Sequence, residues 1–460
     1  MKKGVEYEGT VLRTDFPNKG IVACEGEKVT VKGALEGQKV SFALSKQRNG
    51  RYEGRLHSVI EKSPLECREP ECPHFDSCGG CTYQRLSYEN QLKFKSEQVK
   101  RILDNAGNSD YEFMGIAASP NEWGYRNKME FSFGDAMRDG ELTLGLHKQG
   151  SFYDILQISD CKIVNNDYNE INKCVVETCR EYNLTYCHKL SHQGYLRHLL
   201  IRRAATTGEI LVHLVTTSQW TNQNLSETDF YEYLADKLYS LKLDGSIVGF
   251  LHLINDDPAD AVKADKTDII RGKNFFFEEI LGQIFKITTF SFFQTNSFGA
   301  EVLYSIVRDY VGETKDKVIF DLYSGTGTIA QILAPVAKNV IGVEIVPEAV
   351  ESAKANSALN GLTNCSFICG DVLKTLDDIS DKPDIIVLDP PREGIHPKAL
   401  EKIINYGVDH LVYISCKPTS LANDLTILRE GGYKLEKVKC CDMFPNTVHV
   451  ETVCLLTKTK

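Results

Sequence analysis

The 460-residue chain lacks the segments that would tie it to a membrane. No apolar run reaches the roughly 18 residues that a helix needs to cross a bilayer, and Met1 to Glu8 lack the apolar core of a signal peptide. We therefore expect a cytoplasmic protein without membrane contact, and we expect a monomer. Hydrophobic residues make up 42% and charged residues 25%, which excludes a disordered or fibrous chain. The length predicts several domains.

An excess of positive charge is also missing, since the net charge is −10. That value argues against a nucleic-acid binder, but the charge is unevenly distributed. Residues 1–60 hold 11 Lys and Arg against 7 Asp and Glu, so they carry +4 and the other 400 residues carry −14. A basic segment on an acidic body is typical of a phosphate-binding module. On charge alone, an ordinary solvated surface explains it equally well.

Cysteine is abundant, with fifteen residues. Without an export signal the thiols are expected to be reduced. Four of them crowd into fifteen positions, namely Cys67, Cys72, Cys78 and Cys81, which indicates metal binding. Cys72, Cys78 and Cys81 with the remote Cys161 can hold a [4Fe–4S] cluster. Zinc is the alternative, with His74 inside the loop, and the spacing leaves both open.

Two different sequence patterns precede residue 290. Short alternating apolar runs separated by turn residues over 5–60 predict four or five strands in a small β-barrel, a fold that often binds oligonucleotides. A helix is expected over 87–104, and the mixed α+β pattern continues to 290. The predicted buried face of that helix holds Tyr88, Leu92, Val99, Ile102 and Leu103, and the predicted outer face holds Lys93, Lys95, Lys100 and Arg101.

From about residue 300, strand-like and helical segments alternate regularly. A helix is expected over Pro347–Asn360, with proline in its first turn and Gly361 after its end. This order predicts an α/β fold with a mostly parallel, doubly wound, Rossmann-like sheet. We therefore expect three segments, 1–60, 61–290 and 291–460. The predicted strands of the last one are Val318–Leu322, Val340–Glu344, Ser366–Cys369, Asp384–Leu388 and His410–Ser415.

The first three of these strands lead into a candidate nucleotide site. Asp321 to Thr328 contains a Gly-x-Gly turn that lets a ligand approach the backbone. Glu344, 19 residues after Gly325, is placed for ribose hydroxyls, and Asp371 for an adenine amino group. The strict dinucleotide fingerprint is missing because position 330 is alanine. An adenosine ligand without a pyrophosphate, such as S-adenosylmethionine, fits better, with a dinucleotide as the alternative.

The later strands end in reactive side chains. Asp389 is followed by two prolines and Arg392, a stiff acidic loop that amino-methylating enzymes also carry, so it leaves the target atom open. Cys416 follows a strand and has the cation of Lys417 beside it, which could favour the thiolate. Glu451 could serve as a base. A buried structural thiol and a surface glutamate are the alternatives.

These motifs together resemble the RNA (uracil-5-)-methyltransferase family, over nearly the whole chain. The matching segments are Phe292 to Gln294, Asp389 to Arg392, Ser415 to Pro418, and Phe444 to Glu451. The N-terminal segment resembles a TRAM domain, the RNA-binding barrel of several RNA-modifying enzymes. The chain looks most like the bacterial 23S rRNA enzymes, because the tRNA enzymes generally lack the barrel and the cysteine cluster. Lys417 is a departure, since many members have asparagine there.

The resemblance implies a role for each matching residue. Cys416 would be the nucleophile that adds to uracil C6, and Glu451 would accept the C5 proton. The same pattern favours a [4Fe–4S] cluster on Cys72, Cys78, Cys81 and Cys161, and 23S rRNA as the substrate. A tRNA uracil methyltransferase and an RNA-binding iron–sulfur redox protein are the alternatives. The implied S-adenosylmethionine site comprises Gln294, Tyr323, Glu344 and Asp389, with Thr328 and Asp371 as further candidates.

Overall fold

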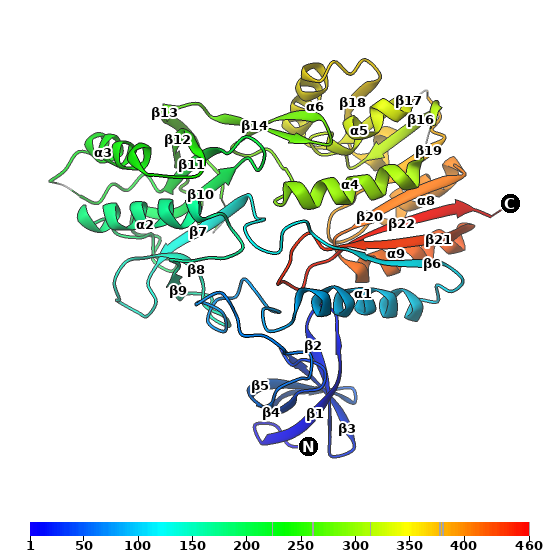
Figure 1. Cartoon of the computed structure of the whole chain (residues 1–460), viewed down its shortest axis with the longest axis horizontal. Helices are drawn as coiled ribbons and strands as arrows, with labels where there is room; N and C mark the ends of the chain where they lie inside the picture. The colour runs from blue at the N-terminus through cyan, green and yellow to red at the C-terminus, as the bar shows by residue number, and fades with distance from the viewer. Residues whose placement is uncertain (223, 260–261, 313, 377–378, 380, 460) are drawn as a thin grey trace.

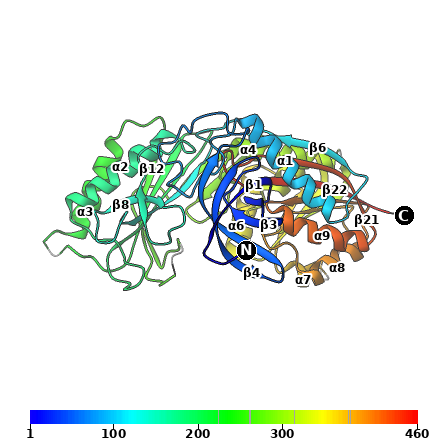
Figure 2. The ribbon, with the colours of Figure 1, turned by 90° about the horizontal axis from the view of Figure 1, so that it is seen from below.

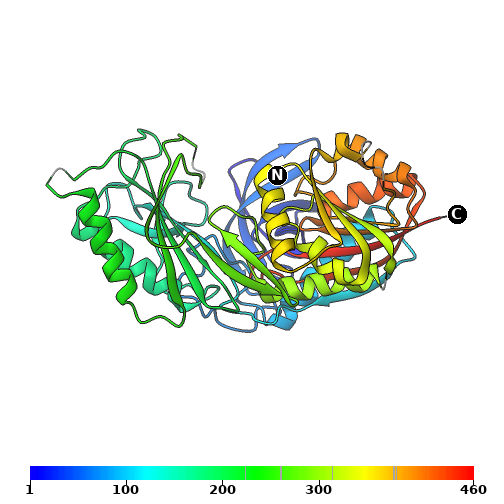
Figure 3. The same cartoon turned by 90° about the horizontal axis from the view of Figure 1, so that it is seen from above.

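The computed structural model describes residues 1–459 except 223, 260–261, 313, 377–378 and 380. Figure 1 shows an N-terminal barrel, a lobe on a seven-stranded sheet and a C-terminal lobe on an eight-stranded sheet. The two lobes lie side by side, and the barrel lies below them near helix α1 (Tyr88–Asn105), as Figures 2 and 3 show from below and from above. Across this described part of the chain, no helix is long and apolar enough to cross a membrane.

The N-terminal barrel is closed in the order β1-β2-β3-β5-β4, which confirms the predicted small β-barrel. Alternation of side chains builds its core: in β3, Val29 and Val31 are fully buried while Lys28 and Lys32 face solvent. Gly54 is required by close packing, because a Cβ there would lie 2.6 Å from the ring of Phe42. The strands are β1 (Glu6–Asp15), β2 (Lys19–Cys24), β3 (Glu27–Lys32), β4 (Lys39–Arg48) and β5 (Arg51–Glu61).

The C-terminal sheet has the order β18-β17-β16-β19-β20-β22-β21-β6. The first five strands in that order are parallel, with helices between them, so the predicted Rossmann-like fold is confirmed. The strands are β16 (Thr314–Leu322), β17 (Ala337–Glu344), β18 (Cys365–Cys369), β19 (Ile385–Leu388), β20 (His410–Ser415), β21 (Tyr433–Cys441) and β22 (Glu451–Lys458). The helices are α4 (Ser297–Val311), α5 (Thr328–Leu333), a 3-10 turn (Ala334–Val336), α6 (Pro347–Leu359), α7 (Val372–Thr375), α8 (Pro397–Tyr406) and α9 (Pro418–Glu430).

The edge of this sheet comes from much earlier in the chain. Strand β6 (Glu112–Ala117) pairs in parallel with β21, and α1 packs beside it against α9. Residues 88–117 therefore belong structurally with the C-terminal sheet, although they lie inside the predicted middle segment. The segment limits at 60 and 290 stay a prediction.

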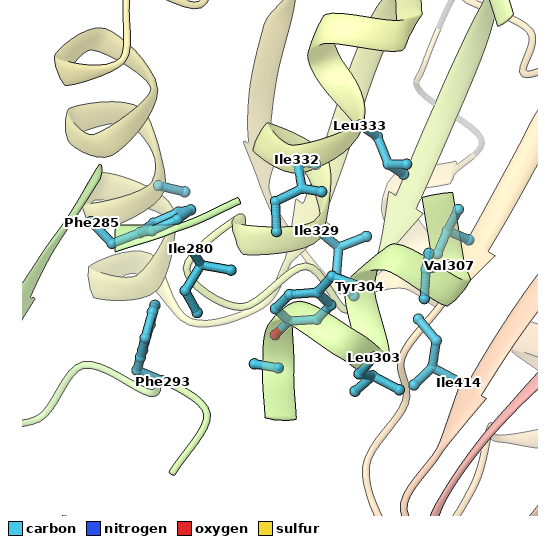
Figure 4. Close-up of a cluster of buried hydrophobic side chains, with 14 of the residues drawn as sticks. Ile280, Phe285, Phe293, Leu303, Tyr304, Val307, Ile329, Ile332, Leu333 and Ile414 are labelled. Carbon is cyan, nitrogen blue, oxygen red and sulfur yellow. The ribbon is translucent and has the colours of Figure 1, made fainter. Parts of the chain in front are cut away.

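The other lobe is a mixed α+β unit, as predicted, with the strand order β13-β12-β11-β10-β7-β8-β9 and the helices α2 and α3. A hairpin, β14–β15, connects it to the C-terminal lobe. Figure 4 shows Ile280 and Phe285 of this hairpin in one apolar cluster with Tyr304 of α4 and Ile329 of α5. The elements are β7 (Lys128–Gly134), β8 (Thr143–His147), β9 (Ile155–Gln157), α2 (Asn166–Glu181), β10 (Leu196–Arg203), β11 (Glu209–Thr216), α3 (Glu227–Ser240), β12 (Ser246–Ile254), β13 (Lys266–Gly272), β14 (Phe275–Ile280) and β15 (Gln283–Thr288).

Helix α1 departs from the predicted orientation at one residue. Lys95 was expected on the solvent side with Lys93 and Lys100, and this prediction was wrong because its side chain is fully buried. Its Nζ donates to Asp442 Oδ1 at 2.7 Å and to the Phe444 carbonyl at 3.0 Å. Helical periodicity could not show this, because the partner that compensates the buried charge lies 347 positions later.

Candidate active site

Most of the predicted site residues come together at one edge of the C-terminal sheet. Parallel strands end at a common edge, so residues that follow them become neighbours in space. The residues brought there are Tyr323 after β16, Glu344 at the end of β17, Asp371 after β18, Asp389 after β19 and Cys416 after β20. The structure thus places the predicted cofactor residues beside the predicted nucleophile.

Glu451 reaches the same edge from an antiparallel strand. Strand β22 begins at Glu451 and pairs with β20 so that Thr452 lies opposite Ser415. Cys416 directly follows Ser415 and Glu451 directly precedes Thr452, so the two residues adjoin the last pair of this ladder. The charge of Glu451 raises the pKa of the Cys416 thiol, which indicates that the two side chains are close. Cys416 is half-buried and Glu451 is 6% exposed, so both groups are partly or largely shielded from water.

Two carboxyl groups at this edge hold protons near neutral pH. Burial, followed by the charge of Asp389, raises the pKa of Glu451 to about 8, and Arg392 acts against this. Burial raises the pKa of Asp389 to about 7. A carboxyl group with a pKa near the working pH can both accept and return a proton. Glu451 therefore has the proton affinity of a general base.

The cation that acts on the thiol is Arg392. Burial raises the pKa of Cys416, the charges of Glu451 and Asp389 raise it further, and Arg392 lowers it. Lys417 was the cation predicted to favour the thiolate; its backbone N–H donates to Ser415 Oγ at 3.2 Å, and its charge is not among those that act on the thiol. Arg392 and Cys416 both belong to motifs visible in the sequence, but their proximity depends on the fold.

Asp321 is a further acid at this edge and was not among the predicted site residues. It is fully buried at the end of β16, and its Oδ2 accepts the Ala330 N–H at 3.0 Å. Its Oδ1 has no hydrogen-bond partner within the described part of the chain. Burial and the charge of Asp389 raise its pKa well above the usual range. A lone acid in the apolar strand Val318 to Leu322 was the signal that could have indicated it.

Tyr304 and Gln294 complete the buried polar group. Burial raises the pKa of Tyr304, and the carboxyl groups of Asp389, Asp321 and Glu451 raise it further, which places the hydroxyl in reach of all three charges. A hydrogen bond with the Gln294 side chain acts in the opposite direction. The predicted cofactor residue Gln294 therefore lies near this edge, on the segment between β15 and α4.

The glycine-rich turn forms a cradle. Tyr323 adopts a left-handed conformation with φ 67°, and the Gly325 N–H donates to Glu344 Oε2 at 2.9 Å. A Cβ at Gly325 would meet nothing within 4 Å, so space for a ligand is open above this turn. Thr328 begins α5 and Asp371 caps α7, which places both at the same edge. The turn and its two carboxylates fit a nucleoside ligand.

The predicted metal ligands meet elsewhere, in one cavity. Cys72, Cys78, Cys81 and Cys161 all line a cavity of about 380 Å³, counted with the part open to solvent, and His74 lines it too. Burial is the main cause of raised thiol pKa values in this cavity. It raises the pKa of Cys78, and it raises the pKa of Cys81 to about 11 and that of Cys161 to about 12. Cysteine residues 89 positions apart in the chain are thus gathered around one space.

The arrangement as it stands does not form a metal site. Among the described residues, no group of three or more His, Cys, Asp or Glu side chains is placed to hold a metal ion. Cys67 stays outside the cavity and accepts a hydrogen bond from Asn90 at 3.8 Å. The four thiols that line the cavity are therefore the same four that were predicted as ligands, and an iron–sulfur cluster stays a prediction.

Comparisons with known proteins point to one enzyme family. The family model of tRNA (Uracil-5-)-methyltransferases matches residues 87–459. An uncharacterized RNA methyltransferase of Caldanaerobacter subterraneus subsp. tengcongensis is 47% identical over 458 residues, covering 100% of both chains. One from Clostridium tetani is 47% identical over 453 residues, covering 98% of both. The structure of Pyrococcus abyssi tRNA (uracil-54, C5)-methyltransferase in complex with S-adenosyl-L-homocysteine is 26% identical, with a TM-score of 0.74, and covers 98% of this chain and 100% of that one.

Proposed function

The chain belongs to the tRNA (uracil-5-)-methyltransferase family, and we propose that it transfers a methyl group from S-adenosylmethionine to C5 of a uridine in structured RNA. One observation carries this proposal beyond the family. Cys416 and Glu451 adjoin Ser415 and Thr452, the last pair between β20 and β22, and the charge of the buried Asp389 acts on both. A thiol and a base on one side of a nucleoside cradle suit a reaction at a pyrimidine carbon.

The chemistry follows from the weakness of uracil C5 as a nucleophile. The Cys416 thiolate adds to C6 through Sγ, the C5=C6 electron pair becomes available at C5, and C5 bonds to the methyl carbon. When bound, S-adenosylmethionine would supply that methyl group as an electrophile, with its methyl–sulfur bond breaking as the new bond forms and S-adenosylhomocysteine as the leaving group. Glu451 then takes the C5 proton, the C5=C6 bond reforms and Sγ leaves as the thiolate. Covalent catalysis replaces one difficult step by easier ones, and the base must leave its stack to enter the pocket.

The proposed cofactor site uses the cradle at the sheet edge. Glu344 is placed for the ribose, Asp371 for the adenine, and Tyr323 and Thr328 line the turn between them. Gln294 and Asp389 are proposed to contact the ligand and to read the uracil edge, because an amide and a carboxyl group complement its carbonyl and N–H groups.

The proposed substrate is 23S rRNA, held in part by the N-terminal barrel. Arg48 and Arg51 lie opposite each other at the tip of the β4–β5 hairpin, where two like charges repel unless an anion such as phosphate joins them. A tRNA is a second candidate, favoured by the similarity to the Pyrococcus abyssi tRNA enzyme. That similarity covers 98% of this chain, so the barrel alone does not separate the two substrates.

The proposal is tested by mapping 5-methyluridine in ribosomal RNA and tRNA from a strain without this protein. A 5-methyluridine missing from 23S rRNA supports the proposal, and one missing from tRNA alone supports the second candidate. If every 5-methyluridine persists, the chain does not make this modification. An RNA-binding redox protein would then be the better description, although such a protein needs neither Cys416 nor Glu451 at a strand end.

For the cysteine cavity we propose a [4Fe–4S] cluster held by Cys72, Cys78, Cys81 and Cys161. The donor chemistry fits, since all four thiols line one largely apolar space. Such a group would supply positive charge that keeps the thiols ionised and would tie the segment after the barrel to the middle lobe. A cytoplasmic location and a monomeric state also stay predictions.

A further inference from the structure

The loop between β21 and β22 leads directly to Glu451 and is held from outside the sheet. It covers residues 442–450. At its start, the buried Lys95 bonds to Asp442 and to the Phe444 carbonyl. In its middle, the hydroxyl of Tyr125 donates to the Pro445 carbonyl at 2.9 Å. The position of the proposed base therefore depends on segments far from the sheet.

Asn446 is the residue on which these contacts converge. It is fully buried and has a left-handed backbone with φ 65°. Its carbonyl accepts the N–H groups of Thr82 at 2.7 Å and Tyr83 at 3.1 Å, the two residues directly after Cys81. Its own N–H donates to Gln91 Oε1 of α1 at 2.8 Å. The backbone of the catalytic loop is thus joined to the backbone that follows a cavity thiol.

The Asn446 side chain makes a second connection to the same cavity. Its Oδ1 accepts hydrogen bonds from Gln91 Nε2 at 3.0 Å and from an Arg68 guanidinium nitrogen at 3.1 Å. Arg68 Nε donates to the Gln84 carbonyl at 2.8 Å. Gln84 lines the cavity, and its side-chain oxygen accepts the Cys72 N–H at 3.1 Å. Asn446 is therefore linked to the chain on both sides of the cavity.

We propose that Asn446 is a positioning residue that couples the state of the cysteine cavity to the placement of Glu451. The inference rests on the proposed function, because it assigns Glu451 the role of base. Buried hydrogen-bonding groups cannot move apart without losing their partners, so Thr82 and Tyr83 carry Asn446 with them. When the cavity thiols lose the group that holds them, the loop shifts and proton removal from C5 slows. RNA capture and addition of Cys416 are left intact.

Asn446→Gly is the informative variant, because glycine accepts the left-handed backbone without strain while the side chain is lost. A small misplacement of a catalytic group costs about 10²-fold in rate, so we expect proton removal to slow by roughly 10- to 100-fold. The methylated protein–RNA adduct should then accumulate, and kcat should fall while kcat/KM for RNA stays unchanged, because the slowed step follows methyl transfer. Asn446→Asp keeps the acceptor oxygen and should restore most of the rate.

A matched control is Asn172→Ala, in the other lobe. Asn172 is also fully buried and bonded through both side-chain atoms, to the Leu144 carbonyl and to Gln157. Its loss should lower the thermal midpoint by a comparable amount without accumulation of the adduct. If Asn172→Ala accumulates adduct as Asn446→Gly does, the effect is general destabilisation and the proposal is overturned.

Coupling itself is tested by a double-mutant cycle with Cys72→Ser, because Cys72 lies at the end of the connection that the Asn446 side chain makes through Arg68 and Gln84. Cys72→Ser and Asn446→Gly should each slow proton removal, and the double variant should be no slower than the worse single one, because both act on this connection. Hydrogen–deuterium exchange of the peptide spanning residues 442–451 should rise in both single variants. Additive rate losses, or exchange in this peptide that stays at the wild-type level in Cys72→Ser, would overturn the coupling.

The exchange measurement also separates this inference from the proposed function. If wild-type protein forms no covalent complex with RNA containing 5-fluorouridine, whose C5–F bond cannot release a proton, then the proposed chemistry fails. The exchange of residues 442–451 still reports whether the cavity and the loop are coupled. If the covalent complex forms and the exchange is unchanged, the proposed function stands and the coupling is wrong.

Discussion

The cysteines of this chain occupy two contrasting environments. Cys416 lies half-buried at a sheet edge, where burial and then the charge of Glu451 raise the pKa of its thiol and Arg392 acts against them. In the cavity, burial and the neighbouring thiols raise the pKa of Cys81 and of Cys161. Burial raises the thiol pKa in both, and the neighbours differ: carboxyl groups and Arg392 act on Cys416, whereas other thiols and Arg126 act on Cys81.

This contrast indicates what each thiol can do. A thiol reacts and binds metal as the thiolate, so it needs a cation nearby. At Cys416 a single thiol has Arg392 beside it, and a thiolate there is available to a substrate. In the cavity Arg126 lowers the pKa of Cys81, but four thiols ionise together only with further positive charge such as a metal supplies, and then the sulfur atoms are occupied. One environment suits a nucleophile and the other suits ligands.

The largest expected effect comes from Cys416→Ala. Without the thiol no addition to C6 takes place, so activity and the covalent complex with 5-fluorouridine RNA should both disappear on denaturing electrophoresis. Cys369→Ser is the matched control, because Cys369 is an exposed thiol at the carboxyl end of β18, another parallel strand of the same sheet. It should keep the covalent complex. Residual activity in Cys416→Ala would place the enzyme in another methyl-transfer class.

The next effect is expected for Glu451→Gln, which removes the base after methyl transfer. Loss of a general base costs about 10²–10⁴-fold, so a methylated protein–RNA adduct should persist. In wild-type protein the carboxyl group must be unprotonated to act. With a pKa raised to about 8, the rate of proton removal should therefore fall as the pH drops through that value. The Gln variant should lack this pH dependence. Wild-type turnover in Glu451→Gln would show that another group is the base.

Metal content tests the second environment. Protein purified without oxygen should contain iron and acid-labile sulfide in about equal amounts, as a cubane cluster requires. Cys161→Ser should lose them, since Cys161 lines the cavity, while Cys67→Ser should retain them because Cys67 lies outside. Colourless, active protein with stoichiometric zinc would contradict the cluster.

Local patterns in the sequence were sufficient for the C-terminal fold. The parallel strands alternate with helices, so their ends could be predicted within a few residues, and α6 ends one residue before the predicted limit. Position at a strand end also brought Tyr323, Glu344, Asp389 and Cys416 to one edge without knowledge of distant contacts. Their roles stay predictions, but their proximity follows from topology.

Other features depend on partners that periodicity cannot reveal. Lys95 is buried because Asp442 meets it from the far end of the chain, and β6 joins a sheet whose other strands begin about 200 residues later. Asp321 and Arg392 belong to motifs that the sequence shows. Their effects, however, depend on neighbours in the fold: the charge of Asp389 acts on Asp321, and the charge of Arg392 acts on Cys416. Sequence motifs indicate which residues can react, whereas the charges that surround each of them can be identified only in the folded chain.

The smallest expected effect comes from Arg392→Gln. This variant tests the contrast between the two thiol environments directly, because it removes the protein's own cation from beside the reactive thiol. Arg392 lowers the pKa of Cys416 and of Glu451, so Arg392→Gln should raise both. Formation of the covalent complex should then slow at neutral pH and recover as the pH rises. Because Arg392 is exposed and water screens its charge, we expect a loss of less than about tenfold. Arg392→Lys keeps the charge and should stay near wild type. A pH profile of complex formation that is identical in Arg392→Gln and wild type would mean that the thiol ionises without help from this cation, and the proposed difference between the two environments would fail.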